Sequence, residues 1–176
     1  MIRLFVTGSI ICASMESIFP GYIVDILCPP ARIYEEFSTG RAGSTLEVDM
    51  YVPTKKYYGF YIDLKFDRTD SNARSHIQTL AGTDEFDASG VMTNNGIAIP
   101  LILYVGKIEN NREIEISSTT IRQEHLEAYW SDTFEKRITG ITLEAGHYHL
   151  ILKELEDIEQ LNGVPVYFSV KEGTRK

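Results

Sequence analysis

The sequence predicts an all-β protein, an antiparallel β-sandwich of about seven or eight strands with one to three short helices. Three observations point to this fold. Hydrophobic and polar residues alternate with a period of two in several segments, as in strands that bury one face. Turn residues separate these segments at short intervals, which is typical of antiparallel sandwiches. Helical periodicity is scarce, and no helical segment is long enough to form a layer of its own.

The first two alternating segments are residues 45–52 and 57–66. In the first, Leu46 begins a hydrophobic set that recurs at every second position, and in the second Tyr58 does the same. The four residues from Pro53 to Lys56 separate the segments. We therefore expect a hairpin whose loop is longer than a two-residue turn.

Residues 97–108 are nearly all apolar, as expected for a central strand covered on both faces. The pair Asn110-Asn111 then predicts a turn into a strand that includes residues 113–116. Further along, residues 138–143 lead through a turn at Glu144-Ala145-Gly146 into the next alternating strand.

The last strand is expected at residues 164–170, after a turn at Asn162-Gly163. Short helices are expected at residues 73–80, 121–129 and 154–161. No repeat or linker divides the chain, so we expect a single domain over residues 16–176.

Composition agrees with an ordinary globular domain. The 176 residues include 43% hydrophobic and 24% charged residues. The formal net charge is −8, and a field of that sign repels the phosphates of nucleic acids and anionic lipids. We therefore expect no nucleic-acid partner, and contact with a membrane only through a lipid anchor.

Residues 1–15 are a candidate leader. Arg3 precedes an apolar stretch and the small residues Ala13 and Ser14, which is the order of a secretory signal. Cys12 would be acylated in a lipoprotein, although Ile11 stands where that processing requires a small residue. The alternative is an ordinary first strand. We expect export to the periplasm or cell envelope.

Cys28 ends an apolar run, and two cysteines cannot build a disulfide framework. We expect Cys28 to be a free, buried, small hydrophobic residue, with a reactive thiol as the alternative.

Several segments, in their order and spacing, carry a resemblance to a known family. They are Leu80-Ala81-Gly82, Glu85-Phe86-Asp87 with Gly90, Ile99-Pro100-Leu101, Trp130-Ser131, Phe134-Glu135-Lys136, Leu143-Glu144-Ala145-Gly146-His147-Tyr148 and Gly163-Val164-Pro165-Val166. Over residues 32–173 the chain resembles the bacterial family catalogued as domain of unknown function 5625. The resemblance implies a sandwich and export, often as a lipoprotein. It supplies no catalytic residues.

His147 and His149 are the sharpest candidates for a metal site. Residues two apart on a strand point to the same side, so both imidazoles could bind one Zn²⁺ or Cu²⁺, with Asp63 or His125 as a third ligand. The residues on the other face of this strand, beginning at Tyr148 and recurring at every second position, are apolar. We therefore expect the histidines to face solvent and expect no cofactor, with a metal site as the alternative.

Two acidic loops offer oxygen ligands of the kind that Ca²⁺ prefers, one from Asp67 to Asn72 and one from Asp84 to Ser89. The spacing of a 12-residue calcium loop is absent from both. We expect solvated turns, with a calcium site as the alternative.

Tyr51, Tyr57 and Tyr61 occupy the positions that the alternation in their strands assigns to the polar face. If the two strands pair, these rings form an exposed aromatic patch beside Asp63, suited to a protein or a sugar. The alternative is that the tyrosines are peripheral core. Trp130 is expected either to cover one end of the sandwich or to anchor a bound partner.

The sequence indicates the function of the protein less clearly than its fold. No G-x-S-x-G motif is present, and we expect a non-enzymatic protein that binds a partner macromolecule, with an inhibitor or immunity-type protein as one concrete form. The alternative is a carbohydrate- or ligand-binding module that uses the tyrosine face. A metal-dependent enzyme at His147 and His149 is the third hypothesis. The oligomeric state is not indicated.

Overall fold

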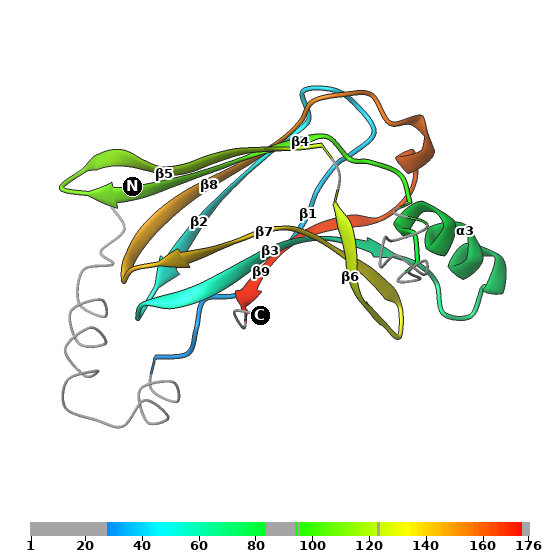
Figure 1. The fold of residues 1–176 in the computed structure, drawn as a ribbon, viewed down its shortest axis with the longest axis horizontal. Coiled ribbons are helices and arrows are strands. Elements are labelled where there is room, and N and C mark those ends of the chain that lie inside the picture. Colours follow the sequence, from blue (N-terminus) through cyan, green and yellow to red (C-terminus); the bar gives the residue numbers. More distant parts are fainter. Residues whose placement is uncertain (1–27, 84–93, 95, 123, 174–176) are drawn as a thin grey trace, which may run out of the picture.

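The computed structural model describes residues 28–83, 94, 96–122 and 124–173. Within them, nine strands form two antiparallel sheets that pack face to face (Figure 1). The five-stranded sheet has the order β1 (Ile33–Glu36), β9 (Val166–Glu172), β3 (Lys56–Lys65), β7 (Thr133–Leu143), β6 (His125–Trp130). The four-stranded sheet has the order β2 (Thr45–Val52), β8 (Gly146–Glu154), β4 (Leu101–Glu109), β5 (Arg112–Ile121). The predicted all-β sandwich is confirmed.

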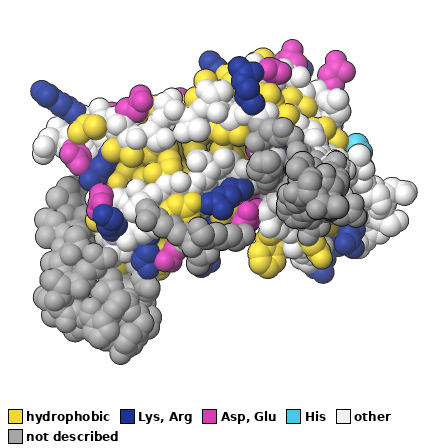
Figure 2. All heavy atoms as spheres, viewed as in Figure 1, with side chains coloured by type: hydrophobic (Ala, Val, Ile, Leu, Met, Phe, Trp, Pro, Cys, Tyr) yellow, Lys and Arg dark blue, Asp and Glu magenta, His cyan; other side chains and the backbone are white. Residues whose placement is uncertain are grey.

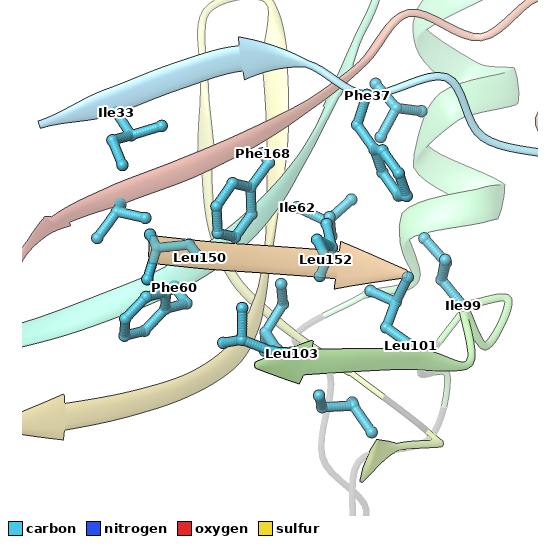
Figure 3. Close-up of a cluster of buried hydrophobic side chains, with 14 of the residues drawn as sticks. Ile33, Phe37, Phe60, Ile62, Ile99, Leu101, Leu103, Leu150, Leu152 and Phe168 are labelled. Carbon is cyan, nitrogen blue, oxygen red and sulfur yellow. The ribbon is translucent and has the colours of Figure 1, made fainter. Parts of the chain in front are cut away.

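The core lies between the two sheets, where the inward residues of both layers meet (Figure 3). Phe60 on β3 and Phe168 on β9 face Leu103 on β4 and Leu150 on β8, and all four are at most 1% exposed. Each such side chain contributes roughly 1.5–3 kcal/mol on burial. The period-two alternation in the sequence reflects this single buried face.

The hairpin between β4 and β5 is confirmed. Asn110 and Asn111 both have positive φ, 51° and 60°. This is the backbone of a two-residue type I′ turn, and asparagine tolerates it better than most residues.

The hairpin predicted for residues 45–52 and 57–66 is wrong. β2 pairs with β8, whereas β3 pairs with β7 and β9, so the chain crosses from one sheet to the other between β2 and β3. Alternation shows that a strand buries one face, and it does not name the partner strand. The longer Pro53–Lys56 connection has room for this crossing.

Of the three predicted helices, the first is confirmed as α3 (Ser71–Ala81), which buries Ile77 and Leu80 at one end of the sandwich. Residues 121–129 instead end β5 and form β6, because pairing with β7 decides between strand and helix for so short an apolar run. Residues 154–161 contain only the 3₁₀ turn η1 (Glu159–Leu161).

Glu154 explains why the third helix does not begin where it was predicted. Its side chain is fully buried at the end of β8, and the carboxylate oxygens accept the Gly40 N–H at 3.0 and 3.1 Å. Burial raises the pKa of Glu154. The residue is therefore part of the strand layer and not of a solvated helix.

Cys28 is buried as expected, at 4% exposure, but it is disulfide-bonded, so the expectation of a free thiol is wrong. Its partner lies outside the described residues. The candidate leader with Cys12, and the acidic loop from Asp84 to Ser89, also lie outside them. Within the described part of the chain, no helix is long and apolar enough to cross a membrane.

Candidate functional site: a polar pocket on the outer face of the five-stranded sheet

The outward residues of β3, β7 and β9 are polar or charged, and three of them are almost completely buried. Asp63 and Glu135 are each 4% exposed and Ser169 is 5% exposed. Asp63 is the direct cross-strand partner of Glu135, and Ser169 pairs with Tyr61, two residues before Asp63 on the same face. Sheet pairing thus brings together polar groups that are far apart in the sequence.

These residues form the floor of an open pocket of about 730 Å³. Its sides include one aromatic ring from each edge strand of the sheet, Tyr34 on β1 and Trp130 on β6. Tyr34 is 47% exposed and Trp130 is 61% exposed. The pocket therefore combines a buried polar floor with exposed aromatic rims.

Lys171 connects the floor to one rim. Its ammonium group bonds to the Glu135 carboxylate and lies 4.6 Å from the centre of the Tyr61 ring and 5.9 Å from that of Trp130. A cation at such distances is attracted to the face of an aromatic ring. Lys171 therefore helps to fix both rings.

Lys65 holds the opposite rim in a similar way. Its Nζ lies 5.3 Å from the centre of the Tyr34 ring and 5.2 Å from that of Tyr167. The two tyrosine rings stack on each other at 4.8 Å with an interplanar angle of 12°. Both lysines of the pocket are thus engaged with groups of the protein itself.

Asp63 and Ser169 differ from the lysines in being almost completely buried, and the Ser169 hydroxyl is a hydrogen-bond partner of the Asp63 side chain. Oδ1 of Asp63 and Oγ of Ser169 are both shielded from solvent. Burial, with a further contribution from the Glu135 charge, raises the pKa of Asp63 from 3.8 to about 6, although Ser169, Lys171 and Lys65 act in the opposite direction. The floor of the pocket therefore holds a buried carboxyl whose proton affinity is raised, and its exposed surface is supplied by the groups above it, among them Tyr34 and Trp130.

The three predicted tyrosines do not share one surface. Tyr51 lies on β2 in the four-stranded sheet, where its ring is 4.8 Å from that of His147. Tyr57 and Tyr61 lie on β3 in the other sheet. Tyr57 accepts a hydrogen bond from Arg137, and Tyr61 is only 6% exposed beneath Lys171. Trp130, in contrast, is exposed and lines the pocket.

His147 and His149 lie on the outer face of β8, as the alternation predicts. His149 lies between Glu47 and Glu113, with N···O distances of 3.9 and 3.5 Å. Asp63 is in the other sheet, as is the backbone of His125, so neither expected third ligand is adjacent. Within the described residues, no three or more His, Cys, Asp or Glu side chains converge on a metal position.

The candidate calcium ligands Asp67 and Asp70 have local structural roles. Asp67 accepts hydrogen bonds from the backbone and the hydroxyl of Thr69 at 2.8 and 2.7 Å. Asp70 caps the N-terminus of α3 by accepting the Asn72 and Ala73 N–H groups. These bonds are typical of turns and helix caps.

Sequence reasoning missed Tyr34, Glu135, Ser169 and Lys171 as site residues. Alternation in the closing strand already places Ser169 and Lys171 on the face opposite Phe168. What it lacks is the strand order, which brings β9 beside β3 and leaves β1 and β6 at the edges.

Comparison with known proteins identifies the family and the fold. The family model described as "Domain of unknown function (DUF5625)" matches residues 34–172. A crystal structure of a protein from Sulfurospirillum deleyianum matches with a TM-score of 0.69 and 16% identity, covering 82% of this chain and 98% of that one, and shows the same fold. A family 35 carbohydrate binding module from an environmental isolate matches with a TM-score of 0.35 and 11% identity, covering 78% of this chain and 71% of that one. Comparison with the curated proteins found no match.

Proposed function

Because the chain belongs to the family described as Domain of unknown function (DUF5625), whose description names no activity, we propose a function from the pocket itself. The protein is a non-enzymatic binding module that takes a hydroxyl-rich small ligand, a carbohydrate, on the outer face of its five-stranded sheet. One observation carries this proposal. An open pocket over the polar outer face of the sheet has the exposed rings of Tyr34 and Trp130 at its sides.

The chemistry of the pocket suits a sugar. Hydroxyl groups both donate and accept hydrogen bonds, and the half-exposed ammonium group of Lys171 has three N–H donors, of which the bond to Glu135 does not use all. Trp130 supplies a broad apolar surface for the C–H face of a sugar ring. Ligand sites commonly join an apolar wall to a few placed polar groups in this way.

We propose that the module acts outside the cytoplasm, in the periplasm or cell envelope. The disulfide at Cys28 supports this location, because disulfides persist in oxidising compartments and are rare in reducing ones.

Trp130→Ala tests the proposed site. We expect it to weaken carbohydrate binding at least about tenfold, since an aromatic anchor commonly contributes 2 kcal/mol or more. The measurement is binding to a printed glycan array, followed by calorimetry with the strongest glycan. Tyr129→Ala is the matched control, because Tyr129 is next in sequence and also 61% exposed but lines a different pocket. Equal losses in the two variants would contradict the proposed site.

A protein partner is the second candidate, and the hairpin of β4 and β5 favours it. Ile114 and Ile116 on edge strand β5 are 46% and 45% exposed, and hydrophobic side chains gather between the two layers on the face shown in Figure 2. The net charge of −8 would speed encounter with a basic partner. Ile114→Lys should then abolish capture of a partner from an envelope extract at low salt. Capture that is unaffected by this substitution would exclude the hairpin as the interface.

A further inference from the structure

We propose that the sugar bound in the pocket carries a carboxylate, as a uronic acid does, and that Arg32 binds this group while the sugar ring lies against Tyr34. This inference rests on the proposed function, a carbohydrate site on the outer face of the five-stranded sheet. It adds to it the chemical class of the sugar and the residue that recognises it.

Arg32 lies at one edge of the five-stranded sheet, immediately before β1. Its side chain lines the outer pocket together with Tyr34, two residues further along the chain, and both residues are exposed. An extended chain rises about 3.3 Å per residue, so these two positions are separated by roughly 7 Å. A sugar ring that lies against Tyr34 can therefore present a substituent to Arg32.

Arg32 also differs from the other cations of the pocket in its surroundings. The lysines of the pocket face carboxylates of the protein, and the buried Asp63 is the one lining carboxyl outside such a pair. The pairs are Lys171 with Glu135, Lys65 with Asp132 at 3.9 Å and Lys56 with Glu172 at 3.0 Å. Among the described residues, no carboxylate forms an ion pair with Arg32. Its guanidinium group is therefore available to an anion of the ligand.

The guanidinium group favours a carboxylate over a neutral hydroxyl. It is planar, remains charged at every physiological pH and has five N–H donors in a fixed arrangement. Two of these donors can bond to the two oxygens of one carboxylate, and such charge-assisted bonds are roughly twice as strong as bonds between neutral groups. A neutral sugar offers Arg32 only the weaker kind of bond.

The net charge of −8 opposes an anionic ligand at long range. At physiological ionic strength, however, the interaction between exposed charges is largely screened beyond about 8 Å. The groups that line the pocket therefore decide whether the carboxylate is accepted. We expect the preference for an acidic sugar at physiological ionic strength, and a smaller preference at about 1 M salt, where the screening length is about 3 Å.

The test compares uronic-acid oligosaccharides with their carboxyl-reduced counterparts, in which a primary alcohol replaces the carboxylate and the ring is unchanged. Glycan arrays and calorimetry with the wild-type chain should show about tenfold tighter binding of the acidic member of a pair. Arg32→Gln should remove this preference and bind the reduced member as the wild type does. Arg112→Gln is the matched control, because Arg112 is exposed on β5 in the other sheet and its loss changes the net charge equally.

The outcomes separate this inference from the proposed function. Equal binding of both members of every pair by the wild-type chain overturns the inference, and so does a preference that Arg112→Gln reduces as much as Arg32→Gln. In either case, binding that Trp130→Ala weakens leaves the proposed function standing. Absence of binding to acidic, reduced and neutral glycans alike overturns both. Thermal melting confirms that each variant is folded, and the comparison within the wild-type chain needs no variant.

Discussion

Asp63→Asn is expected to stabilise the ligand-free protein by about 3 kcal/mol above pH 7 and to have almost no effect below about pH 4. Burial raises the pKa of Asp63 from 3.8 to about 6 on folding. In the range between these two values the folded state binds more protons than the unfolded state, so stability is highest at low pH and is lost as pH rises. Asparagine resembles the protonated carboxyl in shape and avoids this cost.

Urea denaturation across that pH range measures the effect of Asp63→Asn. The matched control is Asp49→Asn, on an exposed position of the four-stranded sheet, which should change the free energy of unfolding by less than about 0.5 kcal/mol. A destabilised Asp63→Asn variant above pH 7 would mean that the carboxylate has a stabilising partner in the folded protein. The predicted gain, in contrast, is the pattern expected of a group kept for function at a cost in stability.

Lys136→Met is expected to destabilise the protein by about 3–5 kcal/mol. Lys136 is fully buried on the inner face of β7, and its Nζ donates to the Ile97 carbonyl at 2.6 Å. Glu124 is also fully buried and accepts the Ile99 N–H at 3.0 Å. Burial lowers the pKa of Lys136, and the Glu124 charge partly offsets this effect. Removing the lysine leaves the Glu124 carboxylate without that cation.

A double-mutant cycle tests this account of Lys136. Glu124→Gln keeps an acceptor for the Ile99 N–H and removes the charge, so the double variant Lys136→Met/Glu124→Gln should be more stable than the sum of the single effects predicts. Lys153→Met, at an exposed position of β8, is the control and should be nearly neutral. Simple additivity would contradict a coupling between the two buried charges.

The sequence predicts the sandwich because a strand that buries one face has hydrophobic residues at every second position. This alternation does not indicate which strands pair with each other. Residues 45–52 and 56–65 follow one another in the chain, yet they lie in different sheets, since an alternating strand can pair with any other alternating strand. Asn110-Asn111 was recognisable because a two-residue turn with positive φ requires particular residue types, and the connection between β2 and β3 has no such requirement.

The site was less predictable than the fold. The sequence indicates Trp130 as a candidate binding residue, and it indicates Asp63 only as a neighbour of tyrosines and as a candidate metal ligand. Glu135 and Ser169 come from strands that the sequence could not place beside β3. Burial of a polar residue on an outward face depends on what its neighbours cover, and here Lys171 and the aromatic rims provide that cover. Alternation alone assigns such a residue to solvent.

Trp130 also provides the most direct test of the central claim, that the outer pocket of the five-stranded sheet is a carbohydrate site. It is the only tryptophan in the chain and lines the pocket, so its fluorescence reports occupancy without a label. Titrating the wild-type chain with the glycan that binds it most strongly should change the Trp130 emission saturably, with the same midpoint as calorimetry. Calorimetric binding of that glycan with unchanged Trp130 emission would place the ligand elsewhere on the molecule and contradict the account.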